Sequence, residues 1–168
     1  MIFLLDVNVL LAYRYPAHVH HARVRGWVTR VRGDADQHNV VFATCPITEL
    51  GFVRVGSGPA HLAVSVEMAR ADLRSLKSSE NMVFIPDDIP ERDLPEWVRK
   101  PAHTTDGYLL ALAKTHGGHL ATLDESIPGA VLIPDETPAP LSVREAAALS
   151  TWTTPLRTGL QTDSAHWR

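Results

Sequence analysis

Features that define several large protein classes are missing from this sequence of 168 residues. It contains one cysteine, Cys45, so no disulfide bond can form within the chain, and the expected compartment is the reducing cytoplasm. No apolar run is long enough to cross a membrane. The apolar opening residues lack the basic start of a secretion signal and are interrupted by Asp6. We therefore expect a cytoplasmic protein without a membrane partner.

A glycine-rich loop that could hold nucleotide phosphates is also missing, because Gly56-Ser-Gly58 lacks the lysine of such loops. The net charge of -3 argues against a protein that simply coats nucleic acid. Residues 1–77 nevertheless carry nine basic against six acidic side chains, and residues 78–168 carry seven against thirteen. The basic residues of the first part include Arg14, Arg23, Arg25, Arg30, Arg32 and Arg54. These arginines could form a local phosphate-binding face, or they could simply lie on solvated helix surfaces.

What the sequence does contain is an alternation of β-type and α-type segments. Short apolar or β-branched stretches predict strands at 2–5, 40–44, 82–85, 119–123 and 130–133. Helical patterns lie between them, at 20–32, 46–55, 60–77 and from Thr104 to Gly117. This alternation predicts an α/β fold with three layers, in which helices cover both faces of a mostly parallel sheet of four to five strands.

The chain divides near residue 134. Residues 1–134 contain all the predicted strands and are long enough to bury a sizeable core, since 45% of the chain is hydrophobic. Residues 135–168 form a polar C-terminal extension with one predicted short helix, which begins at the capping pattern of Ser142 and Glu145.

Residues 103–124 have the clearest local pattern. Thr104 or Thr105 is a suitable N-cap for an apolar helix, and Gly117 with Gly118 is a typical end for one. A short buried strand follows and leads into Asp124. One acid, Asp106, thus lies at a helix start, and another lies at the end of the next strand. In an open α/β sheet these two positions border the same crevice.

Two further acids occupy comparable positions: Asp6 follows the first strand, and Glu49 lies near the start of a helix. Taken singly, each acid is better explained by a turn, an N-cap or the helix dipole. Four carboxylates in one crevice, however, repel each other unless a cation compensates them. Hard oxygen ligands without cysteine or paired histidine favour Mg²⁺ or Mn²⁺.

These segments together resemble a PIN domain, and more narrowly the VapC toxins of toxin–antitoxin pairs. The resemblance covers about residues 1–134, and all four acids are matched in order. One departure is Gly107, where such proteins usually carry alanine, and the C-terminal extension is another. The matching segments are Leu5-Asp6-Val7-Asn8, Pro46 to Arg54, Thr105-Asp106 with its helix, Ala121 to Asp124, and His20 to Trp27.

The resemblance implies a metal-dependent endoribonuclease whose toxicity is blocked by a cognate VapB-like antitoxin. Asp6, Asp106 and Asp124 would bind Mg²⁺ or Mn²⁺, and Glu49 would complete the site directly or through water. RNA is the implied substrate, and a homodimer is the implied assembly. The matched residues Asn8 and Thr122 are assigned supporting hydrogen bonds, and a purely local role is equally compatible with both.

Other residues are weaker candidates. Arg14 and His103 could contact substrate phosphate, or lie on the surface without such a role. His18, His20 and His21 lack a carboxylate to complete a metal set and are expected at an exposed helix start, near a dimer or antitoxin surface.

Two other functions stay open from the sequence. A phosphatase of the haloacid dehalogenase type would need a second aspartate where Asn8 stands. A PIN-like module could also bind RNA or protein without catalysis, although retention of all four acids argues against it.

Overall fold

The computed structural model describes residues 1–33, 40–58 and 64–135, and Met1–Asp135 form one compact unit. The predicted short helix at Ser142 and the start of the helix predicted at 60–77 lie outside the described residues.

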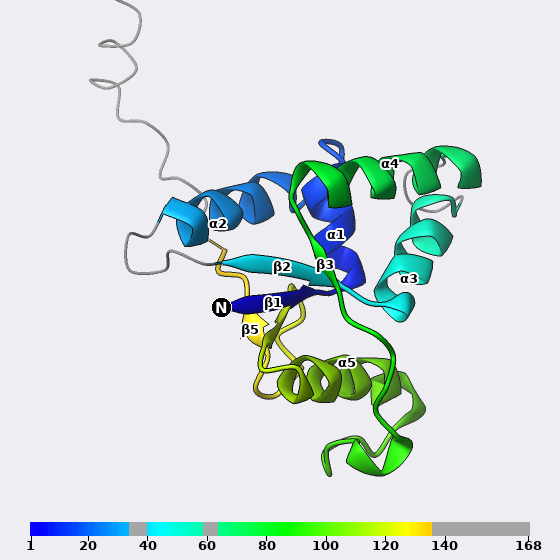
Figure 1. Cartoon of the computed structure of the whole chain (residues 1–168), viewed down its shortest axis with the longest axis vertical. Helices are drawn as coiled ribbons and strands as arrows, with labels where there is room; N and C mark the ends of the chain where they lie inside the picture. The colour runs from blue at the N-terminus through cyan, green and yellow to red at the C-terminus, as the bar shows by residue number, and fades with distance from the viewer. Residues whose placement is uncertain (34–39, 59–63, 136–168) are drawn as a thin grey trace, which may run out of the picture. The chain divides into compact units, whose positions relative to one another are not determined.

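A five-stranded sheet forms the centre of this unit (Figure 1). Its order is β3-β2-β1-β4-β5, and all neighbouring strands run parallel. From β1 the chain adds β2 and β3 on one side of the sheet and then β4 and β5 on the other. In a parallel sheet, the carboxyl ends of the two strands at such a reversal, here β1 and β4, border a crevice. The strands are β1 (Ile2–Leu5), β2 (Val41–Thr44), β3 (Val83–Phe84), β4 (His119–Thr122) and β5 (Val131–Leu132).

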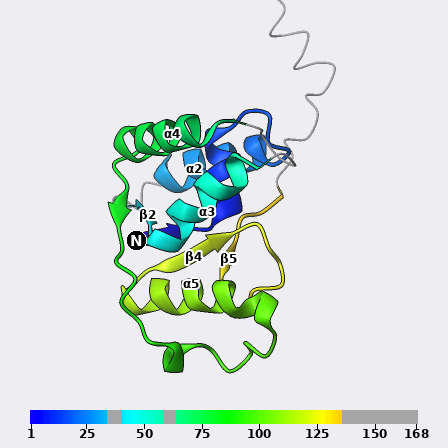
Figure 2. The same cartoon turned by 90° about the vertical axis from the view of Figure 1, so that its right-hand side faces the viewer.

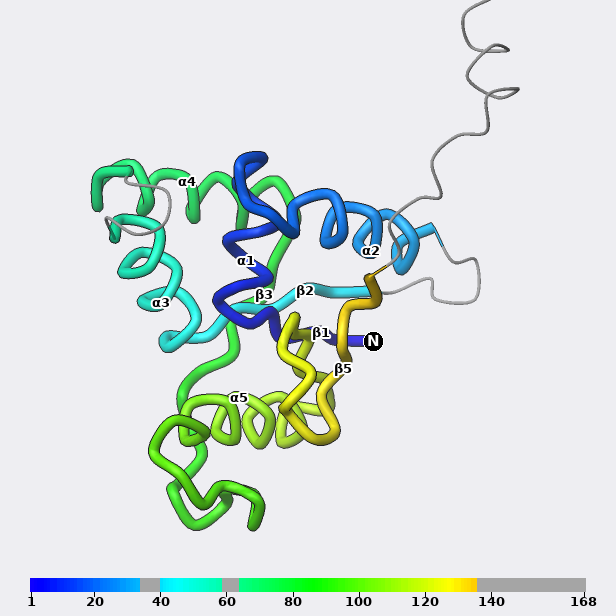
Figure 3. Tube along the Cα trace, turned by 180° about the vertical axis from the view of Figure 1, so that it is seen from behind, coloured from blue at the N-terminus to red at the C-terminus, as the bar shows by residue number. Residues whose placement is uncertain are grey.

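Helices cover both faces of the sheet, so the predicted α/β fold with three layers is confirmed. Figure 2 shows α2, α3 and α4 above the strands and α5 (Thr104–Thr115) below them, and Figure 3 shows the same layers from behind. The four helices on the upper face are α1 (Val7–Arg14), α2 (His21–Gly33), α3 (Pro46–Gly56) and α4 (Val66–Ser79).

Successive residues of β1 pack into two separate hydrophobic cores, one on each face of the sheet. Phe3 and Leu5 of β1 pack with the layer of four helices, where Phe3 meets the Trp27 ring edge-on at 5.2 Å between centroids. Leu4, between them in sequence, packs with α5 residues such as Leu110 on the other face. This alternation follows from the period of two in a strand. It fixes the register of β1, and therefore the position of the residue that follows it.

One helix of the structure was not predicted from the sequence, and the start of another was predicted at the wrong residue. Between Val7 and Arg14 the chain forms α1. The predicted N-cap at Thr104 or Thr105 is wrong, because a 3₁₀ turn (Pro101–His103) runs directly into α5 and His103 occupies the cap position. The predicted end is confirmed at Gly117, whose φ of 68° suits glycine.

The loop between β3 and α5 runs down past the sheet and packs against the start of α5 (Figure 1). A methyl group added at Gly107 would lie 2.2 Å from Cγ2 of Val98 in this loop. The glycine therefore permits a close approach of loop and helix next to Asp106. Among the described helices, none is both long and apolar enough to cross a membrane.

Candidate functional site

Asp6 is held at the carboxyl end of β1 by bonds to both of its carboxylate oxygens. It caps α1, and its Oδ1 accepts the Val7 amide at 2.6 Å. Its Oδ2 accepts the Thr122 hydroxyl at 2.9 Å, and its own amide donates to the Ala121 carbonyl at 3.1 Å. Only 9% of Asp6 is exposed. The carboxylate is therefore fixed in orientation and largely shielded from water.

Thr122 links Asp6 to Asp124. Its hydroxyl donates to Asp6 and accepts the Asp124 amide at 3.1 Å, and the side chain is fully buried at the end of β4. Asp124 itself is exposed, and its Oδ1 accepts the Ser126 amide at 2.7 Å. One hydroxyl thus sets the relative position of two acids from neighbouring strands.

Asp106, in the first turn of α5, completes an acidic cluster that we define as Asp6, Asp106 and Asp124. Burial raises the pKa of Asp6 above its ordinary value, and the charges of Asp106 and Asp124 raise it further. Burial also raises the pKa of Asp106, with a further contribution from Asp124. Hydrogen bonds from Ser126 lower the pKa of Asp124. The three carboxylates therefore lie within one another's electrostatic field.

Carboxylate oxygens are the preferred ligands of a hard divalent cation, and the charge of such an ion would relieve the repulsion among the three acids of the acidic cluster. Within residues 1–33, 40–58 and 64–135, no group of three or more histidine, cysteine or acidic side chains lies close enough together to hold a metal ion as the side chains stand.

Glu49 lies in the first turn of α3, but its side chain is engaged elsewhere. Its Oε1 accepts the Thr44 hydroxyl at 2.7 Å and forms an ion pair with Lys77 of α4. Because Thr44 is the last residue of β2, Glu49 still stands at the carboxyl edge of the sheet. The structure brings three of the four predicted acids into one field and pairs the fourth with a lysine.

The other candidate residues lie at the two ends of α1 and at the start of α5. Asn8 is exposed in the first turn, on the side of Asp6. Arg14 lies at the other end, roughly 12 Å along the helix at 1.5 Å per residue, and forms an ion pair with Asp72. His103 precedes α5, and its charge partly offsets the rise that burial causes in the pKa of Asp106 and adds to the lowering of the pKa of Asp124 by Ser126. His103 is thus near the acidic cluster, whereas Arg14 has a partner away from it.

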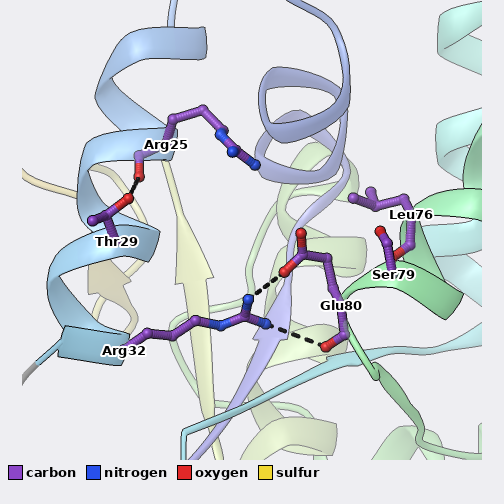
Figure 4. Close-up of polar contacts among 6 residues, drawn as sticks. All are labelled: Arg25, Thr29, Arg32, Leu76, Ser79 and Glu80. Carbon is purple, nitrogen blue, oxygen red and sulfur yellow. Dashed lines mark hydrogen bonds and ion pairs between the residues drawn. The ribbon is translucent and has the colours of Figure 1, made fainter.

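The arginines of the first part are largely used in packing. Arg32 of α2 forms an ion pair with Glu80 and also donates to its carbonyl at 3.2 Å (Figure 4). Arg25 lies with its guanidinium carbon 5.0 Å from the centroid of the Tyr13 ring. Arg23 donates from Nε to the Ile133 carbonyl at 2.9 Å. These contacts hold α2 against its neighbours.

Two partners of the acids were not predicted. Ser126 follows Asp124 by two residues, which is the spacing of a turn in which an aspartate accepts from the backbone, so this contact had a local signal. Lys77 lies 28 residues from Glu49, and no local pattern indicates that pair.

Comparisons with known proteins give relatives over most of the chain, although no family model matches it. Ribonuclease VapC39 of Mycobacterium tuberculosis is 38% identical over 136 residues, which cover 76% of this chain and 91% of that protein. Ribonuclease VapC38 of the same organism is 38% identical over 128 residues, covering 74% and 86%. Ribonuclease VapC44 is 37% identical over 132 residues, covering 74% and 87%.

A solved structure shares the fold. VapBC2 from Rickettsia felis, bound to a DNA fragment from its promoter, superposes with a TM-score of 0.52 over 79% of this chain and 97% of the matched chain. The sequence identity is 15%, so this likeness concerns the arrangement of the sheet and helices alone.

Proposed function

This chain belongs to the VapC family of PIN-domain ribonucleases, and from that premise we propose that it is the toxin of a toxin–antitoxin pair. We further propose that it hydrolyses phosphodiester bonds within RNA with Mg²⁺ or Mn²⁺ held by the acidic cluster. The observation that carries this proposal is the shared field of Asp6, Asp106 and Asp124 at the reversal point of the sheet. A divalent cation bound there would neutralise the acids, activate water and stabilise the leaving oxygen.

The residues around the acidic cluster have separate tasks in this proposal. The Val7 amide and the Thr122 hydroxyl keep the two oxygens of Asp6 turned in a fixed direction. Such support of a ligand typically matters 10- to 100-fold for metal affinity or activity. Asn8, exposed at the start of α1, is suited to hold a water or a substrate oxygen. His103 offers a donor to the substrate phosphate beside Asp106 and Asp124.

Glu49 is the fourth acid of the proposed site. Its ion pair with Lys77 keeps the carboxylate at the edge of the crevice, from which it reaches the site through water or after leaving the lysine. The pair also removes one negative charge from an already acidic region. This lowers the repulsion that RNA meets at the crevice.

The proposed partners are RNA, a VapB-like antitoxin and a second copy of this chain. An antitoxin would block the crevice by offering a basic side chain to the acids. A symmetric homodimer is the common assembly of soluble oligomers, and sedimentation that gives only monomer at working concentration would exclude it.

The function is tested by incubating a panel of labelled structured RNAs with the wild type and with Asp6→Asn, in Mg²⁺ or Mn²⁺ and in EDTA. Asp88→Asn is the matched control, because Asp88 pairs with His116 at 2.9 Å and is not a member of the acidic cluster. We expect metal-dependent cutting by the wild type and the control, and loss of at least about 100-fold in Asp6→Asn.

Equal cutting by the wild type and Asp6→Asn would attribute the activity to a contaminant. Absence of cutting by any of the three proteins, while the wild type still binds RNA, would favour the binding module over the nuclease.

A further inference from the structure

A hollow of about 590 Å³ lies beside the acidic cluster. It is bordered by the start of α1, by the segment that leads into α2, and by the residues that follow β4. Its volume falls in the range of pockets for small ligands. Because Asp124 belongs both to this hollow and to the acidic cluster, an occupant would lie next to the proposed cleavage site. Its polar lining residues are Asn8, His18, His20, Arg23, Asp124 and Glu125.

Two of the three neighbouring histidines form one wall of the hollow. The rings of His18 and His20 are 5.8 Å apart between centroids and tilted by 47°. Nδ1 of His18 accepts the His20 amide at 3.2 Å, so the His18 ring has a fixed orientation. His21 is turned away into the fold, with its Nδ1 2.8 Å from the Ala12 carbonyl oxygen. The hollow therefore presents two half-buried imidazole rings that need little ordering before a ligand binds.

The rest of the lining carries charges of both signs. Arg23 is anchored because its Nε and Nη2 both donate to the Ile133 carbonyl, which holds the plane of the guanidinium. Asp124 and Glu125 lie on the side of β4. A phosphate in this hollow would meet two carboxylates. A nucleobase is neutral, carries donors as well as acceptors, and stacks on imidazole and guanidinium planes.

We propose that this hollow, which we call the histidine pocket, receives one unstacked base of the RNA next to the phosphodiester that is cut. His18 and His20 supply the stacking wall, and Glu125 accepts a hydrogen bond from an exocyclic amino group of the base. Uracil, which has no such group, is the base it disfavours. The proposal rests on the proposed function, because it assumes cleavage at the acidic cluster.

The test uses a single-stranded RNA library with a randomised centre, cut by the full chain in Mn²⁺ and sequenced at the new ends. The wild type is compared with His18→Ala/His20→Ala and with His116→Ala. The last is the matched control, because His116 is at the far end of α5 and pairs with Asp88. We expect the wild type and the control to disfavour uracil at one position beside the cut.

In the double variant we expect KM to rise roughly 10-fold, since base stacking on an aromatic ring is lost. We also expect the preference against uracil to disappear, because the base is no longer held in place against Glu125. Its kcat and its thermal stabilisation by Mn²⁺ should stay close to wild type, which separates a lost base pocket from a damaged metal site or fold. His20→Phe keeps an aromatic face and should retain most of the affinity.

Unchanged base preference and KM in the double variant would overturn the proposal. Unchanged cleavage combined with weaker inhibition by the antitoxin would overturn it too, and would assign the histidine pocket to the antitoxin. A wild type that cuts no RNA in Mn²⁺ would instead count against the proposed function.

Discussion

Replacing Thr122 by valine removes the one hydroxyl that joins Asp6 to Asp124 while keeping the shape of a fully buried side chain. The 2.9 Å bond to Asp6 is made to a carboxylate, and such bonds contribute about 1.5–3 kcal/mol. The 3.1 Å bond from the Asp124 amide is between neutral groups, and water can replace it because Asp124 is exposed. We expect a loss of about 2 kcal/mol in the free energy of unfolding.

This loss corresponds to a fall in Tm of about 4–8 °C. Metal affinity at the proposed site should also fall, because Asp6 loses the donor that sets the direction of its Oδ2. Removal of such a donor typically lowers metal affinity 10- to 100-fold. Thr122→Ser is the matched control: it keeps the hydroxyl and loses one methyl group, which costs about 1 kcal/mol.

The assay is Mn²⁺ titration by calorimetry, run beside thermal unfolding with and without Mn²⁺. Without metal, Thr122→Val should lose about 2 kcal/mol of stability and Thr122→Ser about 1 kcal/mol, but only Thr122→Val should lose Mn²⁺ affinity. If Thr122→Val and Thr122→Ser bound Mn²⁺ equally well, the hydroxyl would have no role in orienting Asp6 for the metal and the reasoning would be refuted.

Three other predictions concern the surroundings of the site. Lys77→Met frees Glu49 from a partly buried ion pair, so Tm without metal should fall by a few degrees while calorimetry shows tighter Mn²⁺ binding; weaker binding would contradict this account. Gly107→Ala gains helix propensity but forces a methyl group to 2.2 Å from Val98, so urea unfolding should give a net loss of about 1 kcal/mol. Adding Val98→Ala should restore that stability, and an unrestored double variant would show that the contact is not the cause. Burial raises the pKa of all three tyrosines, that of Tyr108 to about 12, so the folded state keeps protons that the unfolded state loses above about pH 10. Stability should therefore be intact below pH 10 and fall as the pH rises toward 12, with tyrosinate absorbance at 295 nm appearing together with unfolding; tyrosinate that forms in the folded protein near pH 10 would contradict the burial.

The sheet could be predicted from sequence because each strand is a short apolar run between turn residues. Helix α1 was missed for a physical reason: Val9 to Tyr13 are all buried, so the segment has no amphipathic period to indicate a helix. The start of α5 was misplaced because Thr104 is a good local cap, whereas the preceding 3₁₀ turn supplies the actual entry. The local preference of Thr104 for an N-cap position was therefore overridden by the turn that precedes it.

In the candidate site too, some positions follow from local sequence and others depend on how distant segments pack. Asp6 and Asp124 could be placed together because both follow strands and the alternation implies that those strands are parallel. Whether Glu49 faces the aspartates or a lysine depends on where α4 packs, and Lys77 lies 28 residues away in sequence. Likewise, the role of His18 and His20 as a wall depends on the residues after β4, which the sequence separates from them by about a hundred positions.

The most direct test of the account is the position of Mn²⁺ in crystals of the wild type soaked with the ion, located from its anomalous signal. We expect a peak between the carboxylates of Asp6, Asp106 and Asp124 that is absent from Asp106→Asn crystals treated in the same way. A peak elsewhere on the chain, or none at saturating Mn²⁺, would contradict the claim that these three aspartates hold the metal.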